Sequence, residues 1–583
     1  MRLKHGGHGG ARRKATESDA KESEEGRRLN VKAEGGIDSA FSLQFQPSVF
    51  SSSVPLRVLR ALMSLLLAVT MCASLSAFAQ PKPATPNPAP KAQPEENLEE
   101  RAMEAIAAKD WVKAQEWLLK MVDAGKGKFT PYYNLACVRA VQGDKAGAMD
   151  WLVQSIERGF SDLRQMRRDS YLKTLGDEPA FKKLVEAWPV FLDKRVEKDV
   201  ELAKKLFEAR FAEERDAKQR LVFLSSFDAA AFSDARIEVR QVVRWATLDE
   251  KSVFKGMMDG PDANLDAWVL VVLPKGEAFG RWAQLMFGPA AMSSTSMIGG
   301  AYVHDDKRLV SQDTGATLRH EFMHVLHWRD MDRRGQRHPI YVQEGLCSLT
   351  EDFDVVPGTD VDGVKAIKLA SSWRTNIAKR RERGGTLIPI ETMAAMPHEK
   401  FMGYRPLANY AIARTLFLWL EREGKLSDWY ADYTTNFGED PTGVKSFARI
   451  MGGEAKSIAE ANKRFKAWVR ALPEVPEEIA RGMASLGLDI ETGEGDGVSV
   501  VGFGPRIKDR KSRPVGNEPL VWKVEEGEIR KGDVIRSING RPTREMAELV
   551  RVLSGFHPGE TVELAIRRGK QSVTAKVALV AKQ

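Results

Sequence analysis

The sequence predicts a multidomain protein with a helical region, an α+β domain and a β-rich C-terminal domain. Its 583 residues are too many for one hydrophobic core and predict about three domains. Between residues 98 and 190, apolar side chains recur at steps of three and four, which is the periodicity of helices. Apolar runs typical of strands begin after residue 226 and return after residue 480, which separates the other two domains.

The composition is that of an ordinary globular protein, with 43% hydrophobic and 29% charged residues. The formal net charge is +8, but residues 1–60 hold 11 Lys and Arg against 7 Asp and Glu. That leaves a surplus of only 4 positive charges over the rest of the chain, where no dense basic stripe stands out. We therefore expect no nucleic-acid partner.

The cysteines are too few for a disulfide framework or for a zinc site built on thiolates. They are Cys72, in a predicted targeting segment, and Cys137 and Cys347, in different predicted domains. We expect the last two to be buried free thiols.

The N-terminal part predicts export. Residues 1–55 are rich in Gly, Ser and charged residues and are predicted to be a disordered extension. Arg57 and Arg60 then precede an uncharged apolar run that ends in an A-x-A-like site at Ala79, so residues 56–79 are predicted to be a signal peptide. We expect a periplasmic or extracellular protein. The distance of the signal from Met1 leaves open a translation start further downstream, and retention of the segment as a membrane anchor.

A Pro/Ala-rich linker, residues 80–97, leads into the helical region at residues 98–190. Tyr133-Asn134-Leu135-Ala136, Gly143-Asp144 and Ala148 resemble tetratricopeptide repeats, which place a turn near the middle of a unit of about 34 residues. Only two units are visible, so an ordinary helical bundle stays open as the alternative. Residues 191–225 are predicted to form a connecting helix.

The α+β domain is predicted to span residues 226–475. The alternation in Ile237–Val243 favours a half-buried strand, and the apolar run Ala267–Leu273 favours a central one. Residues 279–287 are predicted to be helical, and Ala301–His304 to form a hairpin with Arg308–Val310. This order of elements resembles the upper half of a zincin-type domain, and the resemblance implies a strand edge along the cleft.

That segment contains His320-Glu321-Phe322-Met323-His324, an H-E-x-x-H motif. On a helix, side chains at i and i+4 point the same way, so His320 and His324 are predicted to bind one metal ion. A catalytic zinc site uses three protein ligands and a water. Glu321 is predicted to take a proton from that water.

Three residues are candidates for the third ligand. His327 lies at i+7 on the same helical stripe, but it is two turns from His320. Asp330 stands where the metzincin pattern requires a His, and His327 stands where that pattern requires a Gly, so the pattern fails. Glu344 lies in Val342–Leu349, a predicted second helix that a polar loop allows to fold back, and it fits better.

Together the motif and Pro339–Leu346 resemble the gluzincin superfamily of zinc metallopeptidases. The resemblance implies a zincin-like fold, with Zn²⁺ held by His320, His324 and Glu344. In thermolysin-like relatives an Asp four residues after the third ligand supports the first His, but this chain has Ser348 there. Glu351 and Asp352 are the alternatives for that supporting role.

A later helix, Asn409–Leu420, is predicted to lie under the cleft. In the superfamily a Tyr or His from the later helices often stabilises the oxyanion. Tyr410 is the first candidate for this catalytic role, followed by Tyr404 and His398. The arrangement resembles a group of exported gluzincin-like proteins in which tetratricopeptide repeats accompany the peptidase domain.

Residues 480–583 resemble a PDZ domain. The resemblance rests on Lys531-Gly532-Asp533-Val534-Ile535 and on Ile538-Asn539-Gly540. It implies an extended or C-terminal peptide ligand, whose carboxylate would meet the loop Leu486, Gly487 and Leu488. A long polar insertion, Pro505–Pro519, departs from the usual pattern, so a domain that only docks on the peptidase stays open.

The sequence thus predicts an exported zinc peptidase, with Glu321 as general base, whose repeat and PDZ modules recruit protein substrates or partners. The alternative is a non-catalytic, zinc-containing scaffold or assembly factor that binds protein termini. A membrane-embedded protease is not expected, because Arg319, Arg329 and Asp330 flank the motif and no membrane-spanning domain follows the signal segment.

Overall fold

The computed structural model describes Phe41–Ser42 and residues 97–582, apart from 208–209, 260–265, 275–276, 288–297, 305 and 504–528. The predicted signal peptide, most of the linker and the PDZ insertion lie outside the described residues.

The region after the linker consists of short helices that pack in pairs. Asn97, Asp110 and Asp144 each cap a helix by accepting a hydrogen bond from a backbone N–H in its first turn. The prediction of a helical region is therefore confirmed, and Cys137 is a buried free thiol as expected. The helices are α2 (Leu98–Ala107), α3 (Trp111–Asp123), α4 (Thr130–Val141), α5 (Lys145–Glu157), α6 (Leu163–Arg168), η1 (Lys173–Leu175) and α7 (Pro179–Glu186).

Two predictions about the next segment are wrong. The connecting helix, α8 (Trp188–Phe207), ends well before residue 225, and β2 (Ala212–Asp216) and β3 (Leu221–Ser225) follow it as an antiparallel pair. Residues 237–243 belong to α9 (Ala229–Val243), which Asp228 caps. Seven residues are too few to distinguish the period of a strand from that of a helix. Over the whole of α9, which begins with three alanines, the buried residues recur every three or four positions, as in a helix.

The predicted central strand and hairpin are confirmed as parts of one sheet of order β1-β5-β6-β4-β3-β2. Strands β3, β4 (Trp268–Val272) and β6 (Arg308–Ser311) are mutually parallel, and β5 (Ile298–Val303) is antiparallel to β6. The short strand β1 (Phe41–Ser42) pairs with the outer edge of β5. Helix α10 (Glu277–Phe287) connects β4 to β5.

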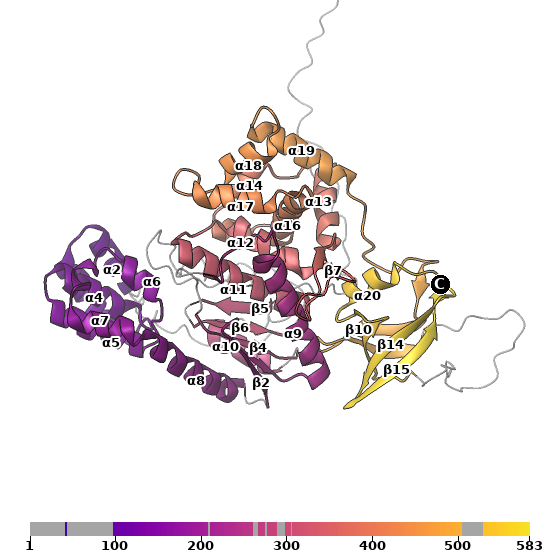
Figure 1. Cartoon of the computed structure of the whole chain (residues 1–583), viewed down its shortest axis with the longest axis horizontal. Helices are drawn as coiled ribbons and strands as arrows, with labels where there is room; N and C mark the ends of the chain where they lie inside the picture. Colours follow the sequence, from indigo (N-terminus) through magenta and orange to yellow (C-terminus); the bar gives the residue numbers. More distant parts are fainter. Residues whose placement is uncertain are drawn as a thin grey trace, which may run out of the picture. The chain divides into compact units, whose positions relative to one another are not determined.

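Both faces of this sheet are covered by helices, because its central strands are apolar on both sides. Leu270 and Leu309 share a core with α9 and with α11 (Ala316–Arg334). Their neighbours Val271 and Val310 share a second core with α8 and α10. The layering fixes α11, the helix of the H-E-x-x-H motif, along one face of the sheet (Figure 1).

After α11 in the chain, the domain is mainly helical. Helix α16 (Pro406–Arg422), predicted from its apolar run, is buried along most of its length and packs on α12 (Ile340–Cys347). The other elements are η2 (Arg244–Leu248), η4 (Ser348–Glu351), β7 (Phe353–Val355), β8 (Ile367–Leu369), α13 (Trp373–Arg383), α14 (Ile390–Ala394), α15 (His398–Gly403), α17 (Leu426–Thr435), α18 (Val444–Met451) and α19 (Ile458–Ala471).

The C-terminal region forms its own sheet, of order β10-β11-β12-β14-β15, around a core that includes Ile535, Leu549 and Leu564. The prediction of a β-rich C-terminal domain is confirmed, and the domain also contains a helix. Its elements are β9 (Ala484–Ser485), β10 (Leu488–Thr492), β11 (Val498–Phe503), β12 (Val534–Ile538), β13 (Arg541–Pro542), α20 (Met546–Leu553), β14 (Thr561–Arg568), β15 (Gln571–Ala578) and β16 (Val580–Ala581).

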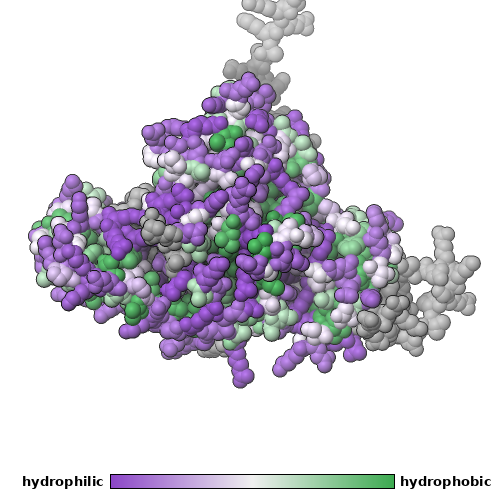
Figure 2. Space-filling view, viewed as in Figure 1, coloured by the Kyte–Doolittle hydropathy of each residue, from purple (hydrophilic) through white to green (hydrophobic). Residues whose placement is uncertain are grey.

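On the face that Figure 2 shows, hydrophobic residues are interspersed among hydrophilic ones. Among the described helices, each is too short or too polar to cross a bilayer.

One contact of the core yields a stability prediction. A Cβ added to Gly345 on α12 would lie 2.3 Å from Cδ2 of Phe417 and 3.1 Å from the carbonyl oxygen of Ala413, both on α16. Gly→Ala inside a helix normally stabilises by about 1 kcal/mol. Here we expect Gly345→Ala to lower the free energy of unfolding by ~1–3 kcal/mol because of overpacking, as measured by denaturant titration.

The matched control is Gly438→Ala, since a Cβ at Gly438 meets no atom within 4 Å. It should change the free energy of unfolding by less than about 0.5 kcal/mol. Equal stability of the two variants would show that α12 and α16 are not packed this closely.

Candidate metal centre

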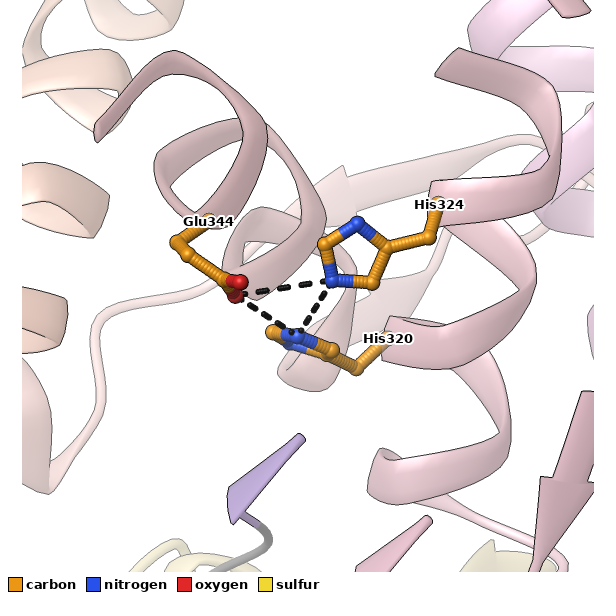
Figure 3. Close-up of side chains that lie close together, drawn as sticks. All are labelled: His320, His324 and Glu344. Atoms are coloured by element: carbon orange, nitrogen blue, oxygen red, sulfur yellow. Dashed lines mark hydrogen bonds and ion pairs between the residues drawn. The ribbon is translucent and has the colours of Figure 1, made fainter. Parts of the chain in front are cut away.

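Two imidazoles of α11 face one another, as the motif predicts. His320 and His324 lie one turn apart, both 1% exposed, and their Nε2 atoms are 3.1 Å apart. Figure 3 shows both rings projecting from the same side of the helix. Their position is fixed by the apolar side chains of α11, such as Phe322 and Val325, which anchor the helix in the core.

The third member comes from the next helix. The chain leaves α11 through Gly335, whose left-handed conformation (φ 67°) ends the helix, and enters α12 after Pro339. This return brings Oε2 of Glu344 to 3.3 Å from Nε2 of His320 and 3.5 Å from Nε2 of His324 (Figure 3). Across the described residues, these three form the one group of metal-binding side chains whose ligand atoms all lie within 4.8 Å of one another.

The chemistry of these atoms fits a cation. Nδ1 of His320 lies 2.9 Å from Oε1 of Glu351, which as a carboxylate accepts a hydrogen bond, so Nε2 is the nitrogen that faces the centre and that would exchange its proton for a metal ion. Burial lowers the pKa of His320, but hydrogen bonds to Glu344 and Glu351 outweigh it and raise the pKa to about 10. The site therefore stabilises positive charge, and two nitrogens with one carboxylate oxygen are a donor set that zinc accepts.

The residue that orients His320 is Glu351, on the turn η4. Of the two alternatives from the sequence, Asp352 instead lies 3.6 Å from Arg414. Arg374 binds both oxygens of Glu351, with Nε–Oε2 and Nη2–Oε1 distances of 2.6 and 2.9 Å. Burial raises the pKa of Glu351, but Arg374 and His320 outweigh it and hold the pKa at about 2. Ser348 takes no part, and its hydroxyl has no hydrogen-bond partner among the described residues.

Two further neighbours of His324 were not predicted. The thiol of Cys347, buried and free, lies 3.1 Å from its Nδ1. The ring of Tyr302 on β5 stacks on the imidazole at a centroid distance of 4.7 Å and an angle of 8°. The position of Cys347 three residues after Glu344, on the same face of α12, is the signal that could have indicated it.

Glu321 lies beside the centre without belonging to the ligand group. It is fully buried, and its two carboxylate oxygens have no hydrogen-bond partner among the described residues. Burial is the main cause that raises its pKa, to about 8. The backbone of β5 passes close by, because a Cβ added to Gly300 would lie 2.8 Å from Cγ of Glu321.

The rival ligands point elsewhere. Nε2 of His327 lies 2.8 Å from Nδ1 of His338. Asp330 accepts hydrogen bonds from Arg333, Arg334 and Tyr430. The geometry thus favours Glu344 as third ligand.

Of the three candidates for the oxyanion role, only Tyr410 lies near the metal-binding histidines. The ring of Tyr410 lies 6.3 Å from that of His320, and its hydroxyl lies 3.6 Å from Sδ of Met402. Tyr404 is 56% exposed, and His398, at the start of α15, is also exposed. The oxyanion role of Tyr410 stays a prediction.

The predicted carboxylate loop of the C-terminal region, Leu486, Gly487 and Leu488, joins β9 to β10. Both leucines are buried in its core. Gly487 has a positive φ of 69°, and its N–H donates to Oγ of Ser485 at 3.2 Å. Peptide binding by this loop stays a prediction.

The support from Glu351 yields a test. We expect Glu351→Gln to weaken zinc binding by roughly 10–100-fold, because a neutral amide orients His320 less firmly and leaves Arg374 without its anion. Titration against a competing chelator measures this. Glu423→Gln, at an exposed position after α16, is the control, and equal affinities of the two variants would contradict the role of Glu351.

Comparison with known proteins bears on the C-terminal region. No curated protein matches the chain. A solved structure, an aminopeptidase N family protein from Idiomarina loihiensis, matches at 10% identity over 64% of this chain and 67% of that one. Its TM-score of 0.22 is too low to support an argument. Residues 504–579 match the model of the PDZ domain, so the chain carries a PDZ domain there, as predicted.

Proposed function

We propose that the chain is an exported zinc-dependent peptidase of gluzincin type. The observation that supports this most is the convergence of His320, His324 and Glu344, from two helices, on one point beside Glu321. A purely structural site would not require a buried carboxylate beside it. A buried carboxyl group whose oxygens have no hydrogen-bond partner among the described residues costs about 1–3 kcal/mol, so a function is the simplest reason to keep it.

The residues would divide the work as follows. Zinc held by His320, His324 and Glu344 supplies Lewis-acid activation of water and of the scissile carbonyl group. As the water oxygen adds to the carbonyl carbon, an oxygen of Glu321 accepts the water's proton. Glu321 then delivers this proton to the leaving nitrogen as the C–N bond breaks. Glu351 holds His320 in place throughout.

The substrate would lie in extended form along β5. The outer side of β5 pairs with the short strand β1, so a substrate in extended form would take the place of β1 beside β5. Gly300 places the backbone of β5 against Glu321. A peptide bond paired with β5 would therefore be held next to the general base.

The flanking modules would supply the targets. The PDZ domain implies binding of a peptide or protein. The N-terminal helix pairs, if they are tetratricopeptide repeats, offer a second protein-binding surface. Export, predicted from residues 56–79, would place this activity in the periplasm or outside the cell.

The test uses the full chain and the variant Glu321→Gln. We expect both proteins to bind one equivalent of zinc, measured by elemental analysis. Cleavage of a peptide library should fall by at least roughly 100-fold in the variant, because it has lost its general base.

Full activity of Glu321→Gln would rule out this mechanism. A wild type that binds zinc but cleaves nothing, with a strong effect only from deletion of the PDZ segment, would favour the scaffold instead. Glu423→Gln serves again as the control for substitution of a Glu far from the site.

A further inference from the structure

Arg319, the residue before the first ligand His320, donates hydrogen bonds to the turn that carries Glu351. It lies on α11 and is 2% exposed. Its Nε donates to the carbonyl oxygen of Thr350 at 2.9 Å, and its Nη2 donates to the carbonyl oxygen of Glu351. Arg319 therefore positions the backbone of η4, and with it the carboxylate that orients His320.

The anions that balance Arg319 come from two domains. Glu238 on α9 accepts from its Nη1, and Oε1 of Glu548, on α20 of the PDZ domain, lies 3.4 Å from its Nη2. A second arginine, Arg544 of the PDZ domain, binds both Glu238 and Glu548. Its Nη2 donates to Glu238 at 2.7 Å, and its backbone N–H donates to Glu548 at 2.8 Å.

These four charged side chains form a closed cluster, the Arg319 cluster, with two members from each domain: Arg319, Glu238, Arg544 and Glu548. Each is at most 7% exposed. The two positive and two negative charges of the cluster balance, and removal of one member leaves the other three with one uncompensated buried charge. The geometry of Arg319 therefore depends on Glu548 and Arg544.

The start of α11 is also in close contact with the PDZ domain. The N–H of Thr314 donates to the carbonyl oxygen of Gly495 at 3.0 Å. A Cβ added to Gly315 would lie 2.7 Å from Cδ of Arg544. The PDZ domain thus holds the motif helix at its first turn as well as at Arg319.

We propose that Arg319 is a positioning residue of the metal centre and that Glu548 of the PDZ domain, as one of its two carboxylate partners, holds Arg319 in place. The PDZ domain is then a structural part of the centre as well as a binding module. This inference rests on the proposed function, because it requires zinc at His320, His324 and Glu344.

The first experiment compares Glu548→Gln with Arg541→Gln in the full chain. Arg541 makes another contact between the PDZ and α+β domains, 3.5 Å from Asp354, but its side chain is 43% exposed and lies outside the Arg319 cluster. We expect Glu548→Gln to weaken zinc binding by about 10-fold and to shift the visible spectrum of the cobalt(II)-loaded protein. Arg541→Gln should leave both unchanged.

The second experiment needs no substitution, so it decides the matter if Glu548→Gln fails to fold. Amide hydrogen exchange of the wild type is measured with and without zinc. If the metal centre and the Arg319 cluster are linked, zinc must slow amide exchange in α20 as well as in α11, while exchange in the hairpin β14–β15 is unchanged.

The outcomes separate this inference from the proposed function. A wild type that binds no zinc would overturn both. A wild type that binds zinc, with equal affinity in Glu548→Gln, would overturn only the role of the Arg319 cluster. If that variant does not fold, unchanged exchange in α20 on zinc binding would do the same.

Discussion

The constraint on which this structure depends is the burial of three electron-rich ligand atoms against one another. Two imidazole nitrogens and a carboxylate oxygen lie 3.1 to 3.5 Å apart. Such an arrangement is stable only if positive charge sits among them, and it fixes the relative placement of α11 and α12. The sheet on one side and α16 on the other are the packing surfaces that hold those helices in position.

Buried arginines extend this constraint outward by holding the short turn after α12. Arg319 binds the carbonyls of Thr350 and Glu351, and Nε of Arg414 binds that of Ser348 at 2.8 Å. Arg374 binds the carboxylate of Glu351. Guanidinium groups suit this task because they present several donors in a fixed plane and stay charged when buried. This turn, in which Leu349 is the one apolar residue, is thereby held in the geometry that His320 needs.

The sequence was sufficient for those parts of the site that local geometry determines. The helical period places His320 and His324 on one side of α11, and a loop that allows the next helix to fold back brings Glu344 to them. For the residue that supports His320, the sequence leaves two alternatives, Glu351 and Asp352. The direction of the Glu351 side chain depends on a 3-10 turn and on Arg374 from a distant helix, which the sequence does not show. Tyr302 and the Arg319 cluster are not predictable for the same reason, since their contacts are tertiary. Cys347 is predictable only from its spacing, because it follows Glu344 by three residues on the same face of α12.

Secondary structure followed a similar division. The long apolar runs of β4 and α16 are unambiguous, whereas the short alternation at residues 237–243 was wrongly predicted to be a strand because seven residues satisfy either period. The hairpin β2–β3 was overlooked because charged residues of β2 continue the pattern of α8. The PDZ domain was recognisable because its turn glycines and strand residues are local in sequence.

In the proposed enzyme, His320, His324 and Glu344 together hold one zinc ion. Anomalous diffraction from a zinc-loaded crystal, measured on both sides of the zinc absorption edge, tests it most directly. We expect a single strong peak bonded to Nε2 of both histidines and to a carboxylate oxygen of Glu344. A peak bonded to His327 or Asp330 in place of Glu344 would show that the third ligand is wrong. A zinc-loaded protein with no peak between α11 and α12 would show that zinc binds elsewhere.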